Sequence, residues 1–247
     1  MSIGLIGGTG LNSLPGLEVL ASHAVDTPYG QPSMAIEEGA YAGRRVFFLH
    51  RHGGGAQPIP PHRVNYRANI WALQLLGVTR IVAANAVGAI NPHMASGKLV
   101  IPDQLIDYSW GREHSFDDGS SGELLHVDFT CPYDTVLRSE LLDAAQVASI
   151  AHVDGGVLGV VQGPRLETAA EVRRFAKDGC DLLGMTGMPE AALARELNMP
   201  YATVCMVVNI AAGMSDEPID INTIRQTLTQ ETALFRGLLT AFLQAQS

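Results

Sequence analysis

The sequence is poor in charged residues, and the charge that it carries is mostly negative. Only 17% of its 247 residues are charged, and the formal net charge at pH 7 is −9 because 25 acidic residues outnumber 16 basic ones. Proteins that bind nucleic acid or anionic membranes need clustered lysine and arginine. The composition therefore excludes such a surface and predicts a small-molecule ligand, with no nucleic-acid or membrane partner.

Cysteine and long apolar runs are also scarce. The three cysteines, Cys131, Cys180 and Cys205, are widely spaced and form no Cys-x-x-Cys motif, which indicates neither a disulfide framework nor a zinc knuckle. The N-terminal segment "MSIGLIGGTG" has no basic lead, and no run approaches about 18 apolar residues, so no signal sequence or membrane span is expected. These absences predict a cytoplasmic protein.

Short hydrophobic runs, by contrast, are abundant. With 47% hydrophobic residues and no compositional shift that marks a linker, the chain is predicted to form a single domain over residues 1–247. Strand-like runs alternate with helix-like stretches, which predicts an α/β fold. The strand-like runs are 3–6, 44–49, 80–85, 156–162 and 203–208, and the helix-like stretches are 64–77, 135–149, 168–177, 189–197 and 221–246.

The stretch from Tyr108 to Pro132 has weak patterning and an excess of Gly, Ser, Asp and His. Irregular segments of this length inside a compact domain commonly carry function. We therefore predict a long loop that serves as a lid over a site or as a subunit contact.

Several predicted strands end in a small, polar, glycine-containing segment. In α/β sheets, ligands bind beyond the carboxyl ends of strands, where loops and exposed amides converge, so these ends predict one shared pocket. The segments are "GGTG" (7–10), "HRHGGG" (50–55), "NAVGA" (85–89), "QGPRLET" (162–168) and "GMTGMPE" (184–190), together with Asn209 in the apolar run "YATVCMVVNIAAGM".

The "GGTG" segment suits an oxyanion. Its glycines let the backbone approach a ligand, and Thr9 adds a hydroxyl donor, although a plain tight turn has the same composition. No Gly-Lys-Ser/Thr follows, so the segment is not a Walker loop. An NAD-dependent oxidoreductase is the competing class of protein, which the missing third glycine of the dinucleotide fingerprint disfavours.

Arg51 and His52 follow a strand too hydrophobic to face water. An arginine can hold an oxyanion through two parallel charged hydrogen bonds, and His52 can add a further donor. The alternative is a structural pair between Arg51 and a carboxylate. A metal site at His50, His52 and His62 is disfavoured because no carboxylate or cysteine joins them at a helical spacing, so no metal is expected.

Residues of the "GMTGMPE" and "QGPRLET" segments also allow two interpretations. Thr186 can donate a hydroxyl to an anion or cap the following helix, and Met185 can lie under a sugar or fill the core. Thr168 and Glu171 form a predicted capping box. This box leaves Glu167 without a structural role.

These segments occur together in a known family. "IGLIGGTGL", "RHG", "VNYRANIWALQLLGVT", "GPRLETAAE" and "GMTGMPEAALARELNMPYA" resemble, in order and nearly end to end, the trimeric purine nucleoside phosphorylase and 5'-methylthioadenosine phosphorylase family. The resemblance implies a nucleoside-phosphorylase fold, with a central mixed twisted sheet flanked by helices, and a homotrimer. It also implies attack of inorganic phosphate, as a co-substrate, on the anomeric carbon of a purine nucleoside, without organic cofactor or metal.

The resemblance assigns roles to individual residues. Met185 would pack under the ribose and Leu166 would contact the substrate. Arg51, Glu167 and Asn209 would be the catalytic residues. The implied phosphate contacts are Thr9, Arg51, His52, Asn85, Ala86 and Thr186.

Four positions distinguish the branches of the family at the base. Enzymes of the methylthioadenosine branch carry aspartates where this chain has Asn209 and Ala211, a small hydroxyl residue in place of Glu167, and a threonine in place of Asn85. Asn85, Glu167 and Asn209 match the branch that cleaves inosine and guanosine. A 6-oxopurine offers a ring N–H to Glu167 and accepts from the Asn209 amide, whereas adenine reverses this pattern. The substitutions predict a hypoxanthine-type base.

The residues expected near the 5' position of the sugar predict a 5' substituent that differs from the hydroxyl of inosine. Enzymes for ordinary inosine place a histidine near the start of the last long helix, and "DEPIDINTIRQTL" (216–228) has none. Ile221 and Ile224 would form an apolar wall that suits a 5'-methylthio group, unless they are only helix core. The predicted reaction is phosphorolysis of S-methyl-5'-thioinosine to hypoxanthine and 5-methylthioribose 1-phosphate in purine and methionine salvage, downstream of a deaminase.

Three alternatives remain open. Within the class they are a general inosine/guanosine phosphorylase and then a methylthioadenosine phosphorylase. A protein that binds nucleosides without catalysis belongs to another class.

Overall fold

The computed structural model describes residues 2–11, 13–54, 57–120, 122, 124–216 and 219–246. Three of the segments that carry predictions contain residues outside these ranges: "HRHGGG" includes residue 55, the 108–132 loop includes residues 121 and 123, and "DEPIDINTIRQTL" includes residues 217 and 218. The described part of the chain forms one mixed sheet of eleven strands, with bounds β1 Ile3–Gly7, β2 Glu18–His23, β3 Ile36–Tyr41, β4 Arg44–His50, β5 Arg80–Ala89, β6 Leu99–Ile101, β7 Gln104–Asp107, β8 His152–Asp154, β9 Val157–Val160, β10 Leu182–Gly184 and β11 Tyr201–Ile210.

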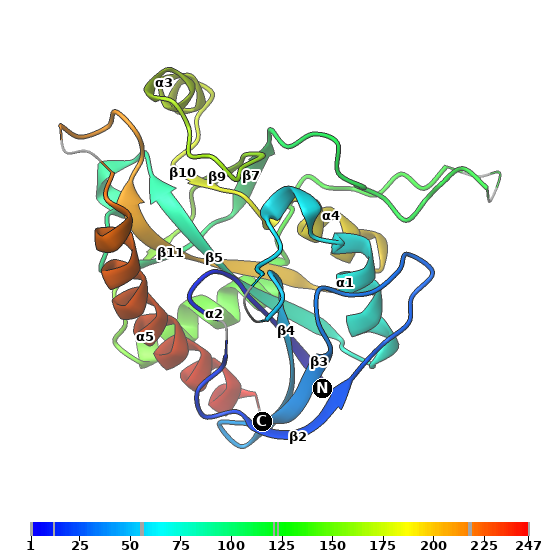
Figure 1. The fold of residues 1–247 in the computed structure, drawn as a ribbon. Coiled ribbons are helices and arrows are strands. Elements are labelled where there is room, and N and C mark those ends of the chain that lie inside the picture. The colour runs from blue at the N-terminus through cyan, green and yellow to red at the C-terminus, as the bar shows by residue number, and fades with distance from the viewer. Residues whose placement is uncertain are drawn as a thin grey trace.

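The long strand β5 is the centre of this sheet (Figure 1). It lies parallel to β1 on one side and to β11 on the other, and its last residues pair antiparallel with β10. β4 lies parallel to β1, and β9 lies parallel to β10. The carboxyl ends of β1, β4, β5 and β11 therefore meet at the same edge of the sheet.

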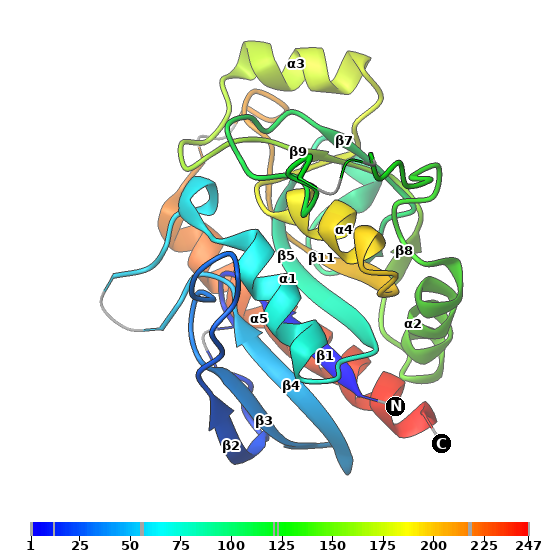
Figure 2. The same ribbon diagram turned by 90° about the vertical axis from the view of Figure 1, so that its right-hand side faces the viewer.

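The helices cover both faces of the sheet (Figures 1 and 2). Buried side chains of α1 and α4 share one hydrophobic cluster with the sheet, and those of α2 and α5 share another. α3 stands apart and buries only Val172 and Phe175. The bounds are α1 Tyr66–Leu75, α2 Thr135–Val147, α3 Ala169–Lys177, α4 Gly187–Glu196 and α5 Ile221–Ala245, with 3-10 turns at Pro61–Arg63 and Pro92–Met94.

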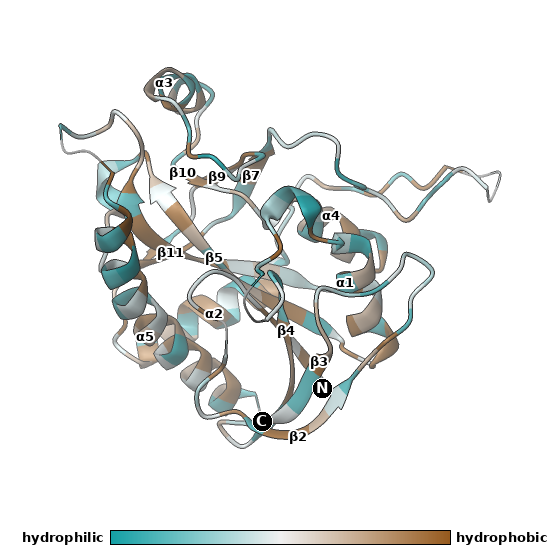
Figure 3. Ribbon diagram, in the orientation of Figure 1, coloured by the Kyte–Doolittle hydropathy of each residue, from teal (hydrophilic) through white to brown (hydrophobic). Residues whose placement is uncertain are grey.

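The hydropathy of the elements explains this arrangement. β1 is buried at all five positions, as expected for a strand that is covered on both faces. α5 alternates hydrophobic and hydrophilic residues around its turns, so that one face packs and the other meets water (Figure 3). Among the described residues, no helix is long and apolar enough to cross a membrane.

The predicted α/β fold, with a mixed sheet flanked by helices, is confirmed. All five strand-like runs and all five helix-like stretches correspond to observed elements, and the described residues of 108–132 form neither helix nor strand. The antiparallel pair β2 and β3 and the short strands β6, β7 and β8 were not predicted. β2 lies at the edge of the sheet with four of six residues exposed, so it lacks the buried periodicity of a strand.

Candidate active site

The "GGTG" segment forms a turn pressed against two neighbouring strands. The Leu11 N–H donates to the Gly8 carbonyl at 3.0 Å, and Gly10 has a positive φ of 88°. A Cβ at Gly8 would lie 2.7 Å from the Ala84 carbonyl oxygen and 2.8 Å from Arg51 Nη1, so only glycine fits there. Thr9 is exposed at the tip of this turn. The tight turn is therefore present, and the contact of Thr9 with an oxyanion stays a prediction.

Arg51 lies beneath this turn and is completely buried, with 0% exposure. Its Nε and Nη2 donate to the two carboxylate oxygens of Glu190 at 2.5 and 2.9 Å, and its Nη1 donates to the Ala84 carbonyl at 2.9 Å. The Tyr201 hydroxyl also donates to Glu190, at 3.0 Å. The structural pair between Arg51 and a carboxylate is thus observed, and the direct contact of Arg51 with phosphate stays a prediction.

Burial and charge act on Arg51 in opposite directions. Burial by itself lowers the pKa of Arg51. The charge and hydrogen bonds of Glu190 raise it by more than burial lowers it, so that the pKa lies above the ordinary value for arginine. A buried arginine with a bidentate carboxylate is held in one geometry. The site therefore has a fixed cation–carboxylate pair directly below the glycine turn.

His52 follows Arg51 and is half-buried. Its Nδ1 lies 2.8 Å from the Ile59 carbonyl, which can only accept, so Nδ1 carries a proton. Burial, and then the nearby Arg51 charge, lower the pKa of His52. The ring is therefore neutral near pH 7 and offers an unprotonated Nε2 as an acceptor. A neutral His52 has no second proton to donate, so the predicted donor role toward phosphate would require the protonated ring.

No metal-binding group of three or more His, Cys, Asp or Glu occurs within the described ranges. His50 lies 3.3 Å from the Glu37 carboxylate, and His62 lies in the 3-10 turn Pro61–Arg63. His50 and His52 thus contact different parts of the chain, and His62 lies in a separate turn.

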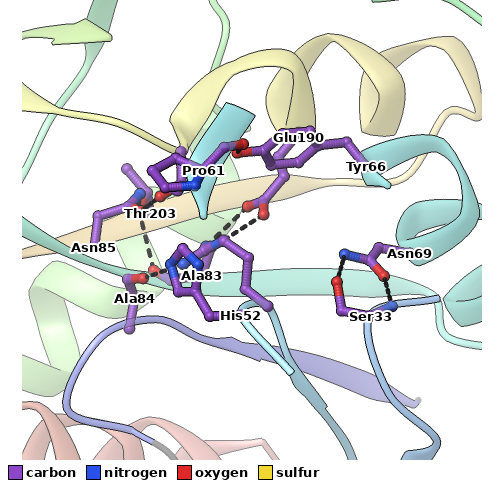
Figure 4. Close-up of polar contacts among 12 residues, drawn as sticks. Ser33, His52, Pro61, Tyr66, Asn69, Ala83, Ala84, Asn85, Glu190 and Thr203 are labelled. Carbon is purple, nitrogen blue, oxygen red and sulfur yellow. Dashed lines mark hydrogen bonds and ion pairs between the residues drawn. The ribbon is translucent and has the colours of Figure 1, made fainter. Parts of the chain in front are cut away.

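Asn85 and Thr186 are brought together by a chain of buried hydrogen bonds, and Figure 4 labels Asn85, Thr203 and Ala83 of this chain. The Thr203 hydroxyl donates its one proton to the Ala83 carbonyl at 3.2 Å, and its oxygen accepts from Asn85 Nδ2 at 2.7 Å. The Asn85 carbonyl then faces Thr186, whose hydroxyl donates to it. Because the side chain of Thr186 makes no capping bond at the start of α4, the helix-cap interpretation is wrong.

Met185 and Ala211 lie in one apolar cluster with Val161, at the point where the Gln162–Thr168 loop begins. A Cβ at Gly163, which has a positive φ of 61°, would overlap the Met185 sulfur. Met185 is only half-buried. One side of it fills the core and another side remains open, so both earlier interpretations of Met185 are compatible with its position. Ala86, on β5, is also half-buried.

Glu167 and Leu166 lie on the loop before α3. Leu166 is 40% exposed, and burial raises the pKa of Glu167 above its ordinary value. The capping box of Thr168 and Glu171 is present as predicted, and Glu171 also pairs with Arg165. A cleft of roughly 560 Å³ adjoins this loop; its lining consists of Tyr108, Trp110, Val161, Gln162, Gly163, Arg165, Glu167, Glu171 and Phe175.

Asn209 lies at the end of β11, directly after an irregularity in its pairing with β5. Its Nδ2 donates to the Ile210 carbonyl at 2.7 Å and would lie 3.3 Å from a Cβ at Gly88. One amide hydrogen is thus used locally and the second remains for a ligand. Within the described part of the chain, no hydrogen bond joins Asn209 to Glu167.

The start of α5 lies beside the glycine turn, because a Cβ at Gly10 would lie 2.6 Å from Leu228 Cγ. Ile224, one turn before Leu228, is half-buried and packs on the core cluster of α2 and α5. Ile221 is 52% exposed. Ile224 therefore contributes to the helix core, and the apolar wall that was predicted from both residues stays a prediction.

Three residues of these networks were not predicted as site residues: Glu190, Tyr201 and Thr203. Glu190 offered a signal, since an acidic residue in an otherwise apolar helix face needs a partner. Tyr201 and Thr203 lie in an apolar strand run, where their hydroxyls gave no local indication of a partner.

Comparison with known proteins identifies the class. Residues 2–244 match the family model of the phosphorylase superfamily. The solved structure of methylthioadenosine phosphorylase from Schistosoma mansoni in complex with adenine superimposes with a TM-score of 0.93 and 30% identity, over 99% of this chain and 91% of that chain. The architecture is that of a nucleoside phosphorylase, an enzyme of the purine nucleoside phosphorylase type.

The chain belongs to the phosphorylase superfamily. It is 49% identical over 241 residues, 98% of both chains, to a Pseudomonas syringae pv. tomato protein named "Probable S-methyl-5'-thioinosine phosphorylase". It is 46% identical over 222 residues, 88% of this chain and 82% of the other, to the "6-oxopurine nucleoside phosphorylase" of Pyrococcus furiosus.

Proposed function

We propose that this enzyme cleaves S-methyl-5'-thioinosine with inorganic phosphate, giving hypoxanthine and 5-methylthioribose 1-phosphate. The observation that carries the proposal is the pair of base-reading side chains: a half-buried Glu167 and an Asn209 amide with one hydrogen to spare. The relatedness to the Pseudomonas syringae pv. tomato protein supports it. In salvage, the substrate would come from deamination of methylthioadenosine.

The Glu167 carboxylate, when ionised, accepts from the ring N–H of the oxopurine. The Asn209 Nδ2 donates to the Ile210 carbonyl. This hydrogen bond holds the side-chain amide in one orientation and so fixes the position of Oδ1. Its second hydrogen is then available to the base oxygen or the adjacent imidazole nitrogen. Adenine would place an unprotonated ring nitrogen against the carboxylate, and sites of this kind reject such analogues by roughly 10⁴–10⁵.

In the reaction, a phosphate oxygen attacks the anomeric carbon while the carbon–nitrogen bond to the purine breaks. The bonding electron pair leaves on the purine, which takes up a proton, and the sugar passes through oxocarbenium character. Thr9, His52, Asn85, Ala86 and Thr186 surround the phosphate in this proposal, and the Thr186 hydroxyl, which donates to Asn85 here, has to turn in order to donate to the phosphate. The neutral His52 accepts from a phosphate hydroxyl through Nε2, and the Arg51 charge stabilises the dianion from below the turn.

A general 6-oxopurine nucleoside phosphorylase is the second candidate, and a methylthioadenosine phosphorylase follows it. The exposure of Ile221 favours the second candidate, because an incompletely closed apolar wall would also admit a 5'-hydroxyl. The relative from Pyrococcus furiosus carries that name.

A direct assay separates the candidates. The purified protein is given methylthioinosine, inosine or methylthioadenosine with phosphate, and base release is followed by absorbance. We expect the highest kcat/KM with methylthioinosine. Equal or higher kcat/KM with inosine would support the second candidate, and comparable turnover of methylthioadenosine would contradict the assignment of the base site. Binding of a purine without phosphate-dependent release would indicate a binding protein.

We further propose a cytoplasmic homotrimer that uses no metal or organic cofactor. The three cysteines are free, as in a reducing compartment. In the 108–132 loop, Trp110, Leu124 and Leu125 expose 70%, 74% and 53% of their surfaces, which a subunit contact would cover. Sedimentation equilibrium tests the trimer, activity after dialysis against a chelator tests the metal, and cell fractionation tests the location.

A further inference from the structure

Arg112, in the 108–132 loop, points its guanidinium at backbone carbonyls from two different segments. Its Nη1 donates to the Met188 carbonyl at 2.6 Å, and its Nη2 donates to the Gln162 and Val161 carbonyls at 3.0 and 3.3 Å. Its Nε also reaches the Gln162 side chain at 3.3 Å. Among the described residues, no carboxylate forms an ion pair with Arg112. Its N–H groups therefore hold backbone segments in position and do not neutralise a charge.

The two segments held by Arg112 carry the two halves of the proposed substrate site. β9 and β10 run parallel up to Val160 and Gly184, and the Val161 N–H still donates to the Gly184 carbonyl at 2.8 Å. Beyond that point the strands separate. One segment continues to Glu167 and the other passes Met185 to Met188, and carbonyl oxygens cannot pair with each other. The five N–H groups of one guanidinium supply the missing donors.

Arg112 itself is held in place on both sides. Its carbonyl lies 2.8 Å from His114 Nδ1, and His114 Nε2 lies 3.1 Å from the carboxylate of Asp107, at the end of β7. Its guanidinium lies over the Tyr66 ring at 5.4 Å, and the Tyr66 hydroxyl donates to the Pro61 carbonyl at 2.9 Å. The guanidinium therefore has little freedom to follow a displaced partner.

We propose that Arg112 is a positioning residue that holds the base-reading loop of Glu167 in fixed register with the Met185–Thr186 segment. The inference rests on the proposed function of these two segments. Without the guanidinium, the base and the ribose would each still meet their contacts, but the two sets would no longer be held at the spacing of one nucleoside. Displacements of about 1 Å remote from the reacting atoms can lower rates by roughly 100-fold.

The test compares Arg112→Met, Arg112→Lys and a matched control, Arg138→Met. Arg138 is also half-buried and also donates to backbone carbonyls, those of Pro102 and Ile101 at 2.9 and 3.1 Å. Unlike Arg112 it also pairs with a carboxylate, that of Asp154, and its partners include no proposed site residue. Each variant is measured for thermal unfolding, for the KM of nucleoside and of phosphate, and for the ratio of kcat/KM between methylthioinosine and methylthioadenosine.

We expect Arg112→Met to lower kcat/KM for the nucleoside by roughly 10- to 100-fold and to reduce the preference between the two bases. Arg138→Met should lower the unfolding temperature to a similar extent without changing that preference. If Arg112→Met does not fold, Arg112→Lys, which reaches only one carbonyl at a time, is expected to show the same change in smaller measure. An unchanged base preference in the folded Arg112 variant would overturn the inference.

The wild-type protein separates this inference from the proposed function. If the wild type prefers another nucleoside, the proposed substrate is wrong, and the effect of Arg112 is then read from the KM of the nucleoside that is cleaved. If the wild type prefers methylthioinosine and Arg112→Met behaves like Arg138→Met, only the inference about Arg112 is wrong.

Discussion

The floor and the rim of the candidate site are built differently. The floor is buried, and it consists of two hydrogen-bonded groups, Arg51 with Glu190 and Asn85 with Thr186 and Thr203, on strands, directly after a strand or at the start of α4. The rim consists of Thr9, Leu166, Glu167, Asn209 and Ile221, which lie on turns, loops or element ends and are half-buried or exposed.

This difference separates two tasks. A buried, fully hydrogen-bonded floor costs no rearrangement when charge develops during the reaction, which suits the invariant part of phosphorolysis. The rim residues have few internal partners, so they can be exchanged without unfolding the floor. We therefore expect substitutions in the floor to affect stability and phosphate use, and substitutions in the rim to affect the choice of nucleoside.

The largest effect is expected at the buried pair. Arg51→Met leaves the Glu190 charge buried without its partner, which costs about 3–5 kcal/mol in the free energy of unfolding. The double variant with Glu190→Gln removes both charges and should recover most of that loss, while the KM for phosphate stays raised by about 10-fold or more. Denaturant unfolding and phosphate kinetics measure both. Wild-type phosphate kinetics in the double variant would contradict the role of Arg51 toward the oxyanion.

The next largest effect is expected at the base-reading pair in the rim. Asn209→Asp together with Glu167→Ser should lower the kcat/KM ratio of methylthioinosine to methylthioadenosine by roughly 100-fold or more, because the acceptor for the ring N–H is lost and an acceptor for the adenine amino group is gained. The unfolding free energy should change little, unlike in the floor variants. An unchanged ratio in the double variant would count against both residues as readers of the base.

The raised pKa of Glu167 leads us to predict a pH dependence of kcat/KM. Burial raises its pKa, so the carboxyl takes up a proton at a higher pH than an ordinary glutamate as the pH falls. The acid limb of kcat/KM for an oxopurine nucleoside should therefore lie above pH 4.5, the ordinary pKa of glutamate. The comparison variant Glu167→Gln should lower kcat/KM and lose this limb. A limb that persists in Glu167→Gln belongs to another group.

A smaller effect is expected at the sugar end. Ile224→Thr should lower the kcat/KM ratio of methylthioinosine to inosine by roughly 10-fold, because the ethyl group on Cβ is replaced by a hydroxyl. The matched change Ile221→Thr, at a residue that is 52% exposed, should have less effect. Equal effects of the two variants would show that Ile221 is covered in the active enzyme, as a neighbouring subunit would do.

The smallest effect is expected at the exposed ion pair of Arg165 and Glu171, on the loop that carries Glu167 and at the start of α3. Arg165, followed by the Thr168 N–H, lowers the pKa of Glu171 from its ordinary 4.5 to about 2. Because the folded pKa is the lower one, the stabilisation is present above about pH 4.5 and is lost as the pH falls through about 2. Acid unfolding of Glu171→Gln should show a weaker dependence on pH between these values. The exposed Arg174→Ala serves as the control.

Much of the fold could be predicted because it depends on local patterns. The five strand-like runs and five helix-like stretches follow from hydrophobic periodicity and from end signals such as the capping box at Thr168. The strands β2 and β3 could not be predicted in this way. β2 lies at the edge with four of its six residues exposed, and β3 has buried and half-buried positions without strict alternation, so periodicity gives little signal for either strand.

The site was predicted unevenly for the same reason. Glycine turns and polar strand ends are visible in the sequence, and they directed attention to Thr9, Arg51, Asn85, Thr186 and Asn209. Which donor serves which acceptor was not visible. Thr186 was equally suited to cap a helix, and only its position opposite Asn85 shows that its hydroxyl is used there.

The sequence by itself determined which chemical groups follow each strand, including the Glu167 and Asn209 side chains that we propose distinguish an oxopurine from adenine. Tertiary structure alone decided the partners. Arg51 and Glu190 are 139 residues apart, and Asn85 and Thr203 are 118 residues apart. A buried polar group must find a partner wherever the fold brings one within about 3 Å, and no local pattern records that distance.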